Sequence, residues 1–102
     1  MGLLAFLGLK AKVNYKEIYE TGAIIIDVRS KGEFSHGNFK GSSNVPLDKI
    51  SEGINNIKSE NKPVITVCKS GIRSGQAAIV LNRNGVEAYN GGSWTSLDSK
   101  LS

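Results

Sequence analysis

One stretch of the sequence, residues 64–78, constrains the fold of this chain more than any other. Four apolar or β-branched residues lead into Cys68, a short loop containing Gly71 follows, and an alanine-rich helical run comes next. This order predicts a buried strand, an anion-binding loop and a helix that begins near Ser74. The chemistry of the chain is therefore expected at the point where this strand ends.

Cys68 is the only cysteine, and it lies between the predicted strand and the predicted helix. Backbone N–H groups and the helix dipole favour an anion at that place, and Arg73 adds a positive charge. These effects are expected to lower the pKa of the thiol and to make Cys68 nucleophilic at neutral pH. A buried structural thiol is the alternative, since free cysteine is among the most buried residue types. The position of Cys68 before the loop favours the nucleophile.

The length of the loop separates two chemistries. Four residues lie between Cys68 and Arg73, whereas phosphatase loops of the tyrosine-specific type have five and surround a phosphate group. The shorter loop predicts a smaller cradle that suits one sulfur atom on the cysteine, and it disfavours phosphatase or arsenate chemistry. Cys68 is the predicted catalytic residue, and the predicted anion-binding loop consists of Lys69, Ser70, Gly71, Ile72, Arg73 and Ser74. No metal site is predicted.

This loop resembles the active-site loop of the rhodanese family, whose members carry a persulfide on the cysteine. Three further motifs extend the resemblance over residues 14–94, in the order in which the family has them. They are the strand ending in Asp27-Val28-Arg29, the segment from Glu33-Phe34 to Asn44-Val45-Pro46, and Gly91-Gly92 followed by Trp94. One position departs from the pattern: Asn38 stands where the family has a histidine, and His36 lies two residues earlier.

The resemblance implies a sulfurtransferase that takes sulfur from a small anionic donor such as thiosulfate and passes it through Cys68 to a thiol, cyanide or protein acceptor. It implies no cofactor. The alternative is a sulfur-carrier or regulatory module of the same fold, which a protein partner loads and reads. Lys69 and Ile72 are the expected exposed loop positions and would set the preference for donor and acceptor.

Three further side chains have a structural interpretation that competes with a functional one. Asp27 and Arg29 end an apolar run, and an acid and an arginine buried together usually satisfy one another. Arg73 either binds the donor or pairs with Glu33 or Asp27. His36 is interpreted as an exposed loop histidine rather than a catalytic base.

The pattern along the chain predicts an α/β fold of three layers, a small parallel sheet with helices on both faces. Its apolar runs are continuous rather than alternating, which is typical of strands buried on both sides. Strands are expected at residues 23–28, 44–45, 64–67 and 86–89, and helices at 14–22, 33–36, 47–59 and 74–84, with a weak helix after Trp94. Gly91-Gly92 is expected to turn the chain, and Trp94 to close the edge of the core.

With 102 residues, the chain has room for one domain, which we place at residues 13–102. Its net charge of +4 comes from scattered lysines without interleaved aromatic residues, so no nucleic-acid partner is expected. A single cysteine excludes an internal disulfide framework and a cysteine-rich zinc site. An unpaired thiol fits a reducing compartment, and the cytoplasm is the expected location.

Residues 1–12 form a separate apolar arm that ends in Lys10 and Lys12. The arm is too short to span a bilayer, which needs about 20 apolar residues. Its lysines follow the apolar run, whereas a secretory signal has them in front. The favoured interpretation is an arm that packs on the domain or frays. The alternative is a short interfacial helix with weak contact to a membrane surface.

Overall fold

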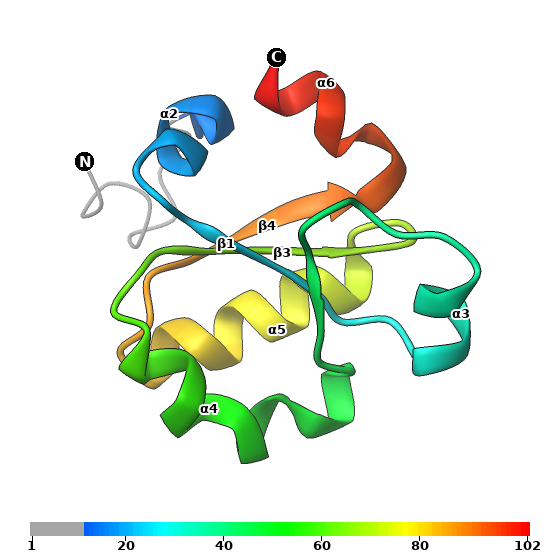
Figure 1. Ribbon diagram of the computed structural model, residues 1–102. Helices are drawn as coiled ribbons and strands as arrows, with labels where there is room; N and C mark the ends of the chain where they lie inside the picture. Colours follow the sequence, from blue (N-terminus) through cyan, green and yellow to red (C-terminus); the bar gives the residue numbers. More distant parts are fainter. Residues whose placement is uncertain (1–11) are drawn as a thin grey trace.

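The computed structural model describes residues 12–102, so the predicted arm lies outside the described residues except for Lys12. In chain order, the elements are α2 (Tyr15–Glu20), β1 (Ile24–Asp27), α3 (Lys31–Ser35), β2 (Ser43–Asn44), the 3-10 helix η1 (Leu47–Lys49), α4 (Ile50–Ser59), β3 (Val64–Cys68), α5 (Ile72–Arg83), β4 (Ala88–Ser93), the 3-10 helix η2 (Trp94–Ser96) and α6 (Leu97–Leu101). Helices and strands alternate along the chain, as the sequence predicts (Figure 1).

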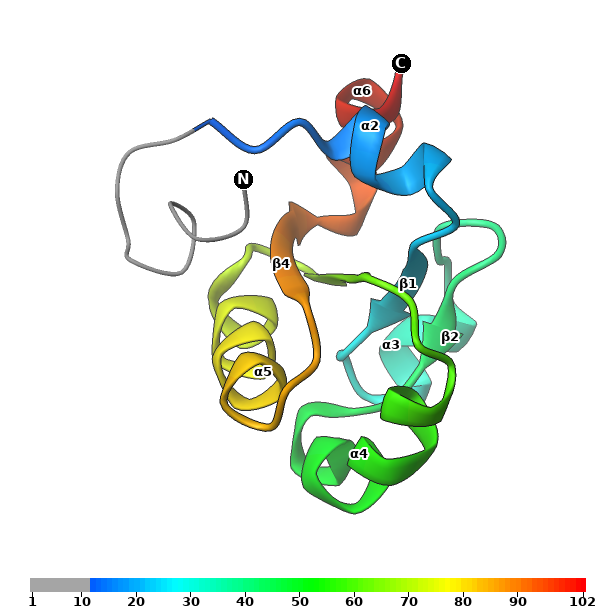
Figure 2. The same ribbon diagram turned by 90° about the vertical axis from the view of Figure 1, so that its left-hand side faces the viewer.

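The strands form one sheet in the order β2-β1-β3-β4, and every neighbouring pair is parallel. Central β3 is buried along its whole length. Helices α4 and α5 cover one face of the sheet, and α2 and α6 cover the other (Figures 1 and 2). The predicted three-layer α/β fold with a parallel sheet is therefore confirmed.

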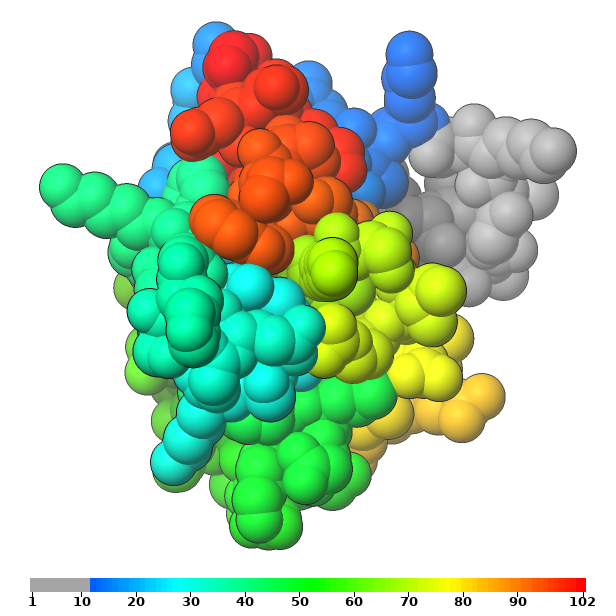
Figure 3. All heavy atoms as spheres, turned by 90° about the vertical axis from the view of Figure 1, so that its right-hand side faces the viewer, coloured from blue at the N-terminus to red at the C-terminus, as the bar shows by residue number. Residues whose placement is uncertain are grey.

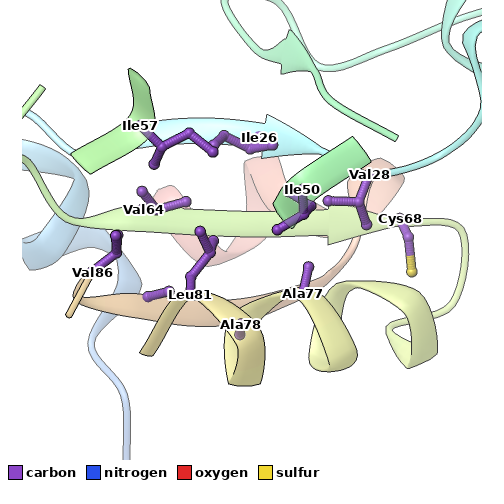
Figure 4. Close-up of a cluster of buried hydrophobic side chains, with 11 residues drawn as sticks. Ile26, Val28, Ile50, Ile57, Val64, Cys68, Ala77, Ala78, Leu81 and Val86 are labelled. Carbon is purple, nitrogen blue, oxygen red and sulfur yellow. The ribbon is translucent and has the colours of Figure 1, made fainter. Parts of the chain in front are cut away.

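Two hydrophobic clusters form the core, one on each face of the sheet. On the α4 and α5 face, side chains such as Ile26, Ile50 and Leu81 pack together, and Cys68 belongs to this cluster (Figure 4). On the other face, Ile65 packs with Leu97, and Trp94 lies partly buried against them. Trp94 closes the edge of this cluster, as expected. Residues of β3 contribute alternately to the two clusters, because successive side chains of a strand point to opposite sides of the sheet.

Several element ends differ from the prediction by one to four residues, and two of these differences lie at the Cys68 loop and at the strand beside it. Helix α5 begins at Ile72 instead of Ser74, because Gly71 takes a left-handed conformation with φ of 106° and turns the loop directly into the helix. Strand β4 continues through Gly91-Gly92, where a turn was expected. A Cβ on Gly91 would lie 2.6 Å from Cγ2 of Ile65, so the glycine lets β4 approach β3 closely at an irregular step of the ladder.

Short-range capping explains where the small helices begin. Asn14 accepts a hydrogen bond from the backbone N–H of Glu17 at the start of α2. Ser30 and Glu33 form a reciprocal capping box at the start of α3, with Ser30 accepting from the Glu33 N–H and Glu33 accepting from the Ser30 N–H. This box fixes the first turn of α3 beside the end of β1. Among residues 12–102, no helix has the length and hydropathy needed to cross a membrane.

Candidate active site

Cys68 is the last residue of β3, and the loop Lys69–Ser70–Gly71 connects it to α5. The carboxyl end of a strand in an open parallel sheet is the usual place for a ligand site. Lys69 and Ser70 are exposed, and Ile72 at the beginning of α5 is 73% exposed. Ser74 is fully buried. The structure thus brings the predicted loop together around one cysteine, with its outer positions in solvent as expected.

The Cys68 sulfur lies under this loop, on the face of the sheet that α5 covers (Figure 4). The backbone N–H of Gly71 donates to Sγ over 3.0 Å, and Oγ of Ser74 lies 3.3 Å from Sγ. The residue has no exposed surface. Cys68 is therefore a core residue that also contacts polar groups at a helix start, and its role as a nucleophile stays a prediction.

The surroundings of Cys68 act on its pKa in opposite directions. Burial raises the pKa of the thiol. Hydrogen bonds to the sulfur outweigh this effect and leave the pKa below its ordinary value of 9.0. These hydrogen bonds involve the Ser74 hydroxyl and the backbone N–H groups of Ser74, Gly71 and Ser70. The lowered pKa of Cys68 was predicted. The groups that lower it most are these loop groups, however, and not Arg73.

Arg73 points its guanidinium at α3. Its Nη1 donates to Oε1 of Glu33 over 2.7 Å and its Nη2 to Oε2 over 3.1 Å. Hydrogen bonds from Arg73 and then from Ser30 lower the pKa of the Glu33 carboxyl to about 2. Of the alternatives for Arg73, the structure shows the ion pair with Glu33. The guanidinium N–H groups that could have bound a donor are hydrogen-bonded to the Glu33 carboxylate. Arg73 therefore ties the beginning of α5 to α3.

Asp27 and Arg29 satisfy one another, as expected. Both are buried, and Nε and Nη2 of Arg29 donate to the Asp27 carboxylate over 2.6 to 3.0 Å. Arg29 also donates from Nη2 to the carbonyl oxygen of Gly37 over 2.7 Å, and its guanidinium lies 4.7 Å from the centre of the Trp94 ring. These contacts hold the segment after α3 and the segment after β4 against the end of β1.

A hollow of about 690 Å³ lies beside the Cys68 loop. It is lined by Arg29, Gly32, Glu33, His36, Lys69, Trp94 and Thr95. Figure 3 shows the face on which its three walls meet: α3 in cyan, the loop in yellow-green and the segment after β4 in orange. Within residues 12–102, Lys69 forms no ion pair, so its ammonium group is available to an anion in the hollow. A second hollow, of about 430 Å³, lies next to Pro63 and Gly85 and has no cysteine or histidine in its lining.

The two residues at the departure from the family pattern make local contacts. His36 is exposed, and its Nδ1 donates to the carbonyl oxygen of Gly32 over 2.7 Å. Nδ2 of Asn38 donates to the carbonyl oxygen of Phe34 over 2.9 Å. His36 lines the hollow but contacts no reacting atom, which agrees with its interpretation as a loop histidine.

One residue at the site was not found from the sequence. Asn90 on β4 accepts a hydrogen bond from the Ser74 hydroxyl over 2.6 Å and donates to the carbonyl oxygen of Gly71 over 3.0 Å. It lies 22 positions after Cys68 in the sequence, next to the glycines of β4. An asparagine before two glycines is typical of a turn, and no local signal relates it to the loop.

The fold and this site match one family. The model of the rhodanese-like domain family matches residues 11–95, and the chain belongs to this family. YqhL, an uncharacterized protein of Bacillus subtilis, is 42% identical over 69 residues, which are 67% of this chain and 54% of YqhL. The tRNA sulfurtransferase of Thermoplasma acidophilum is 27% identical over 81% of this chain and 16% of its own length. The chain thus spans about half or less of these relatives.

Among solved structures, a rhodanese with anions from E. coli superposes with a TM-score of 0.65 at 29% identity, over 72% of this chain and 88% of its own. The chain is therefore similar along most of its length to a single-domain rhodanese. The resemblance found from the sequence motifs is confirmed.

Proposed function

We propose that this chain is a sulfurtransferase that works through a persulfide on Cys68. One observation carries the proposal: the Cys68 sulfur ends a central strand, 3.0 Å from the Gly71 N–H and 3.3 Å from the Ser74 hydroxyl. Groups placed in this way stabilise negative charge on sulfur, as an oxyanion hole does on oxygen. Membership of the rhodanese-like family and similarity to a tRNA sulfurtransferase support the same reaction class.

The proposed reaction has two displacements. The Cys68 thiolate attacks the outer sulfur of thiosulfate, a sulfur–sulfur bond forms to Cys68, and the sulfur–sulfur bond of the donor breaks, with sulfite leaving on its electron pair. A thiol, cyanide or protein nucleophile then attacks the terminal sulfur of the persulfide, and the Cys68 thiolate is released. No electrons are gained or lost overall, and the kinetics are expected to be ping-pong.

We propose that the donor is a small anion that approaches from the hollow beside the loop. Lys69 supplies a positive charge there. The exposed Ile72 is placed to contact the acceptor. Ser70 and Gly71 contribute backbone N–H groups to the sulfur, and Ser74 contributes its hydroxyl. We assign Arg73 to holding the loop through Glu33 rather than to binding the donor.

The test is the intact mass of the protein after incubation with thiosulfate. The parent is expected to gain one sulfur atom and to release one equivalent of sulfite. Cys68→Ser is the matched control, since it keeps the shape of the side chain, and it is expected to gain no sulfur and to release no sulfite. Release of sulfite by this variant at the parent rate would contradict the assignment of Cys68.

A carrier or regulatory module is the second candidate, and the complete burial of Cys68 favours it. A partner protein that displaces the loop would then transfer sulfur to Cys68 and recognise the persulfide. Turnover with free thiosulfate distinguishes the two, because a carrier would be loaded by its partner but not by the free anion. Hydrolysis of an aryl phosphate is expected from neither, because the loop is one residue too short to surround a phosphate.

We also propose the cytoplasm as the location, because a single unpaired thiol stays reduced there. No nucleic-acid partner is proposed. The domain boundary near residue 13 and weak membrane contact through residues 1–12 stay predictions.

A further inference from the structure

Ser74 has one hydroxyl proton and two acceptors within reach. Its Oγ lies 2.6 Å from Oδ1 of Asn90 and 3.3 Å from Sγ of Cys68. The shorter contact is a strong hydrogen bond, and in it the hydroxyl donates to Asn90. The lone pairs of Oγ then face the sulfur and accept from a neutral S–H. A thiolate needs the opposite arrangement, in which Oγ–H points at the sulfur.

The amide of Asn90 is held in one orientation. Its Nδ2 donates to the carbonyl oxygen of Gly71 over 3.0 Å, and its Oδ1 accepts from the backbone N–H of Gly92 over 2.9 Å. A flipped amide would place oxygen against the Gly71 carbonyl and nitrogen against the Gly92 N–H, so both bonds would be lost. Gly75 makes room for the amide, since a Cβ there would lie 3.0 Å from Nδ2. Oδ1 therefore faces Ser74 in a fixed position.

We propose that Asn90 is a positioning residue that competes with Cys68 for the Ser74 hydroxyl proton and so selects between the thiol and the thiolate. In the resting thiol, Sγ–H donates to Ser74 Oγ, and Ser74 Oγ–H donates to Asn90. When Cys68 ionises, its proton passes to the solvent, Ser74 keeps its own proton, and the hydroxyl turns to donate to the thiolate. Asn90 Oδ1 retains the Gly92 N–H, so it is not left without a donor.

The charged groups around the carboxyl end of β3 are the same in every Asn90 variant. They are Lys69 in the loop, Arg73 with Glu33, Arg29 with Asp27, and Lys100 of α6, which donates to the carbonyl oxygen of Gly91. The titratable Tyr15 of α2 donates to the carbonyl oxygen of Asn90. Strand β4, which carries Asn90, has no charged side chain. A difference between Asn90 variants therefore reports Asn90 and not a change of its neighbours.

The test follows the rate of Cys68 alkylation against pH, in the full chain, with iodoacetamide and intact mass as the readout. Asn90→Ala removes the competing acceptor, and its midpoint is expected to fall by about half a pH unit or more. Asn90→Asp adds a negative charge and a stronger acceptor, and its midpoint is expected to rise by about one unit. A residue that only braced the loop would raise the midpoint in both variants, because the N–H groups around the sulfur would be lost.

Two further comparisons complete the test. In a Ser74→Ala background, Asn90→Ala is expected to leave the midpoint unchanged, since no hydroxyl remains to be contested. Asn84→Ala is the matched control and is expected to leave the midpoint unchanged. The Asn84 amide also donates to a backbone carbonyl oxygen, that of Val80, but at the far end of α5. A midpoint that rises in Asn90→Ala, or an equal shift with and without Ser74, would overturn the proposal.

If Asn90→Ala does not fold, as judged by Trp94 fluorescence, Asn90→Asp is measured with and without Ser74→Ala. The rise is expected to be smaller where the hydroxyl is absent, and an equal rise in the two backgrounds would overturn the proposal. A midpoint at or below that of the parent in Asn90→Asp would overturn the proposal. The inference rests on the proposed function only in taking the Cys68 thiolate to be the group that accepts sulfur from the donor. Alkylation reports the thiolate directly. If the parent were not loaded by thiosulfate, that result would therefore contradict the proposed function and not the role of Asn90. If loading does occur, Asn90→Asp is expected to load about tenfold more slowly at neutral pH and to recover at higher pH.

Discussion

At the scale of single residues, the ion pair of Arg73 and Glu33 changes what the loop arginine does. Each side chain is 35% exposed, so the pair is partly screened by water. It joins two elements that are 40 residues apart in the sequence and meet above the end of β3. A guanidinium held in this way positions the loop and adds its charge near the sulfur. It is not free to enclose a donor.

The Glu33 carboxylate, which accepts from both Arg73 and Ser30, predicts a dependence of stability on pH. The folded-state pKa of Glu33 is about 2, below its ordinary value of 4.5. The unfolded chain therefore binds the proton first as pH falls, and the stabilisation that is present above pH 4.5 is lost between 4.5 and about 2. Melting temperatures across this range are expected to fall less steeply in Glu33→Gln than in the parent. Equal slopes in the two proteins would show that the Glu33 carboxylate does not stabilise the fold.

At the scale of elements, the contact between β3 and β4 decides whether the site is assembled. Strand β4 carries Asn90 to the loop, and Gly91 sets how close the two strands come. A Cβ on Gly91 would lie 2.6 Å from Cγ2 of Ile65 and 2.9 Å from the carbonyl oxygen of Thr66. Backbone atoms cannot move away as a flexible side chain can, so the two strands would have to separate.

Gly91→Ala is therefore expected to destabilise the protein by about 1–3 kcal/mol. Urea unfolding followed by circular dichroism measures this. Gly32→Ala is the control, because Gly32 lies in α3 and a Cβ there meets nothing within 4 Å. It is expected to stabilise the protein by up to about 1 kcal/mol, since alanine restricts the unfolded chain. Equal effects of the two substitutions would contradict the close approach of β4 to β3.

At the scale of the whole molecule, the sheet joins two core clusters into one unit. Leu81 of α5 and Leu97 of α6 are both fully buried, on opposite faces of the sheet. The strands between them contribute side chains to both clusters, so neither face is expected to unfold alone. The only tryptophan, Trp94, reports on the Leu97 face.

Leu81→Ala and Leu97→Ala are each expected to cost about 2–5 kcal/mol. In both variants, Trp94 fluorescence and far-ultraviolet circular dichroism are expected to follow the same urea transition. An exposed apolar residue, Ile79, supplies the control, and Ile79→Ala is expected to change stability little. Separate transitions for the two probes in Leu81→Ala would mean that the faces unfold independently.

Local patterns in the sequence determined much of this molecule. The continuous apolar runs gave the parallel strands, and the spacing of Cys68, Gly71 and Arg73 gave the loop and its family resemblance. The pairing of Asp27 with Arg29 was also predictable, because the two residues are neighbours on one strand end. These inferences succeed because helix and strand periods, turns and short spacings depend on residues close together in the chain.

Only the tertiary structure decided which side chains meet at the edge of the sheet. Arg73 pairs with Glu33, and Asn90 reaches Ser74, across 40 and 16 residues of sequence. The sequence had named Glu33 as one of several partners for Arg73 without choosing among them. The passage of β4 through Gly91-Gly92 was mispredicted, since glycine pairs permit a turn and a close strand contact equally well. Such contacts depend on strand order and helix placement, which bring distant segments together. A local pattern does not decide which distant partner a charged or amide side chain will find there.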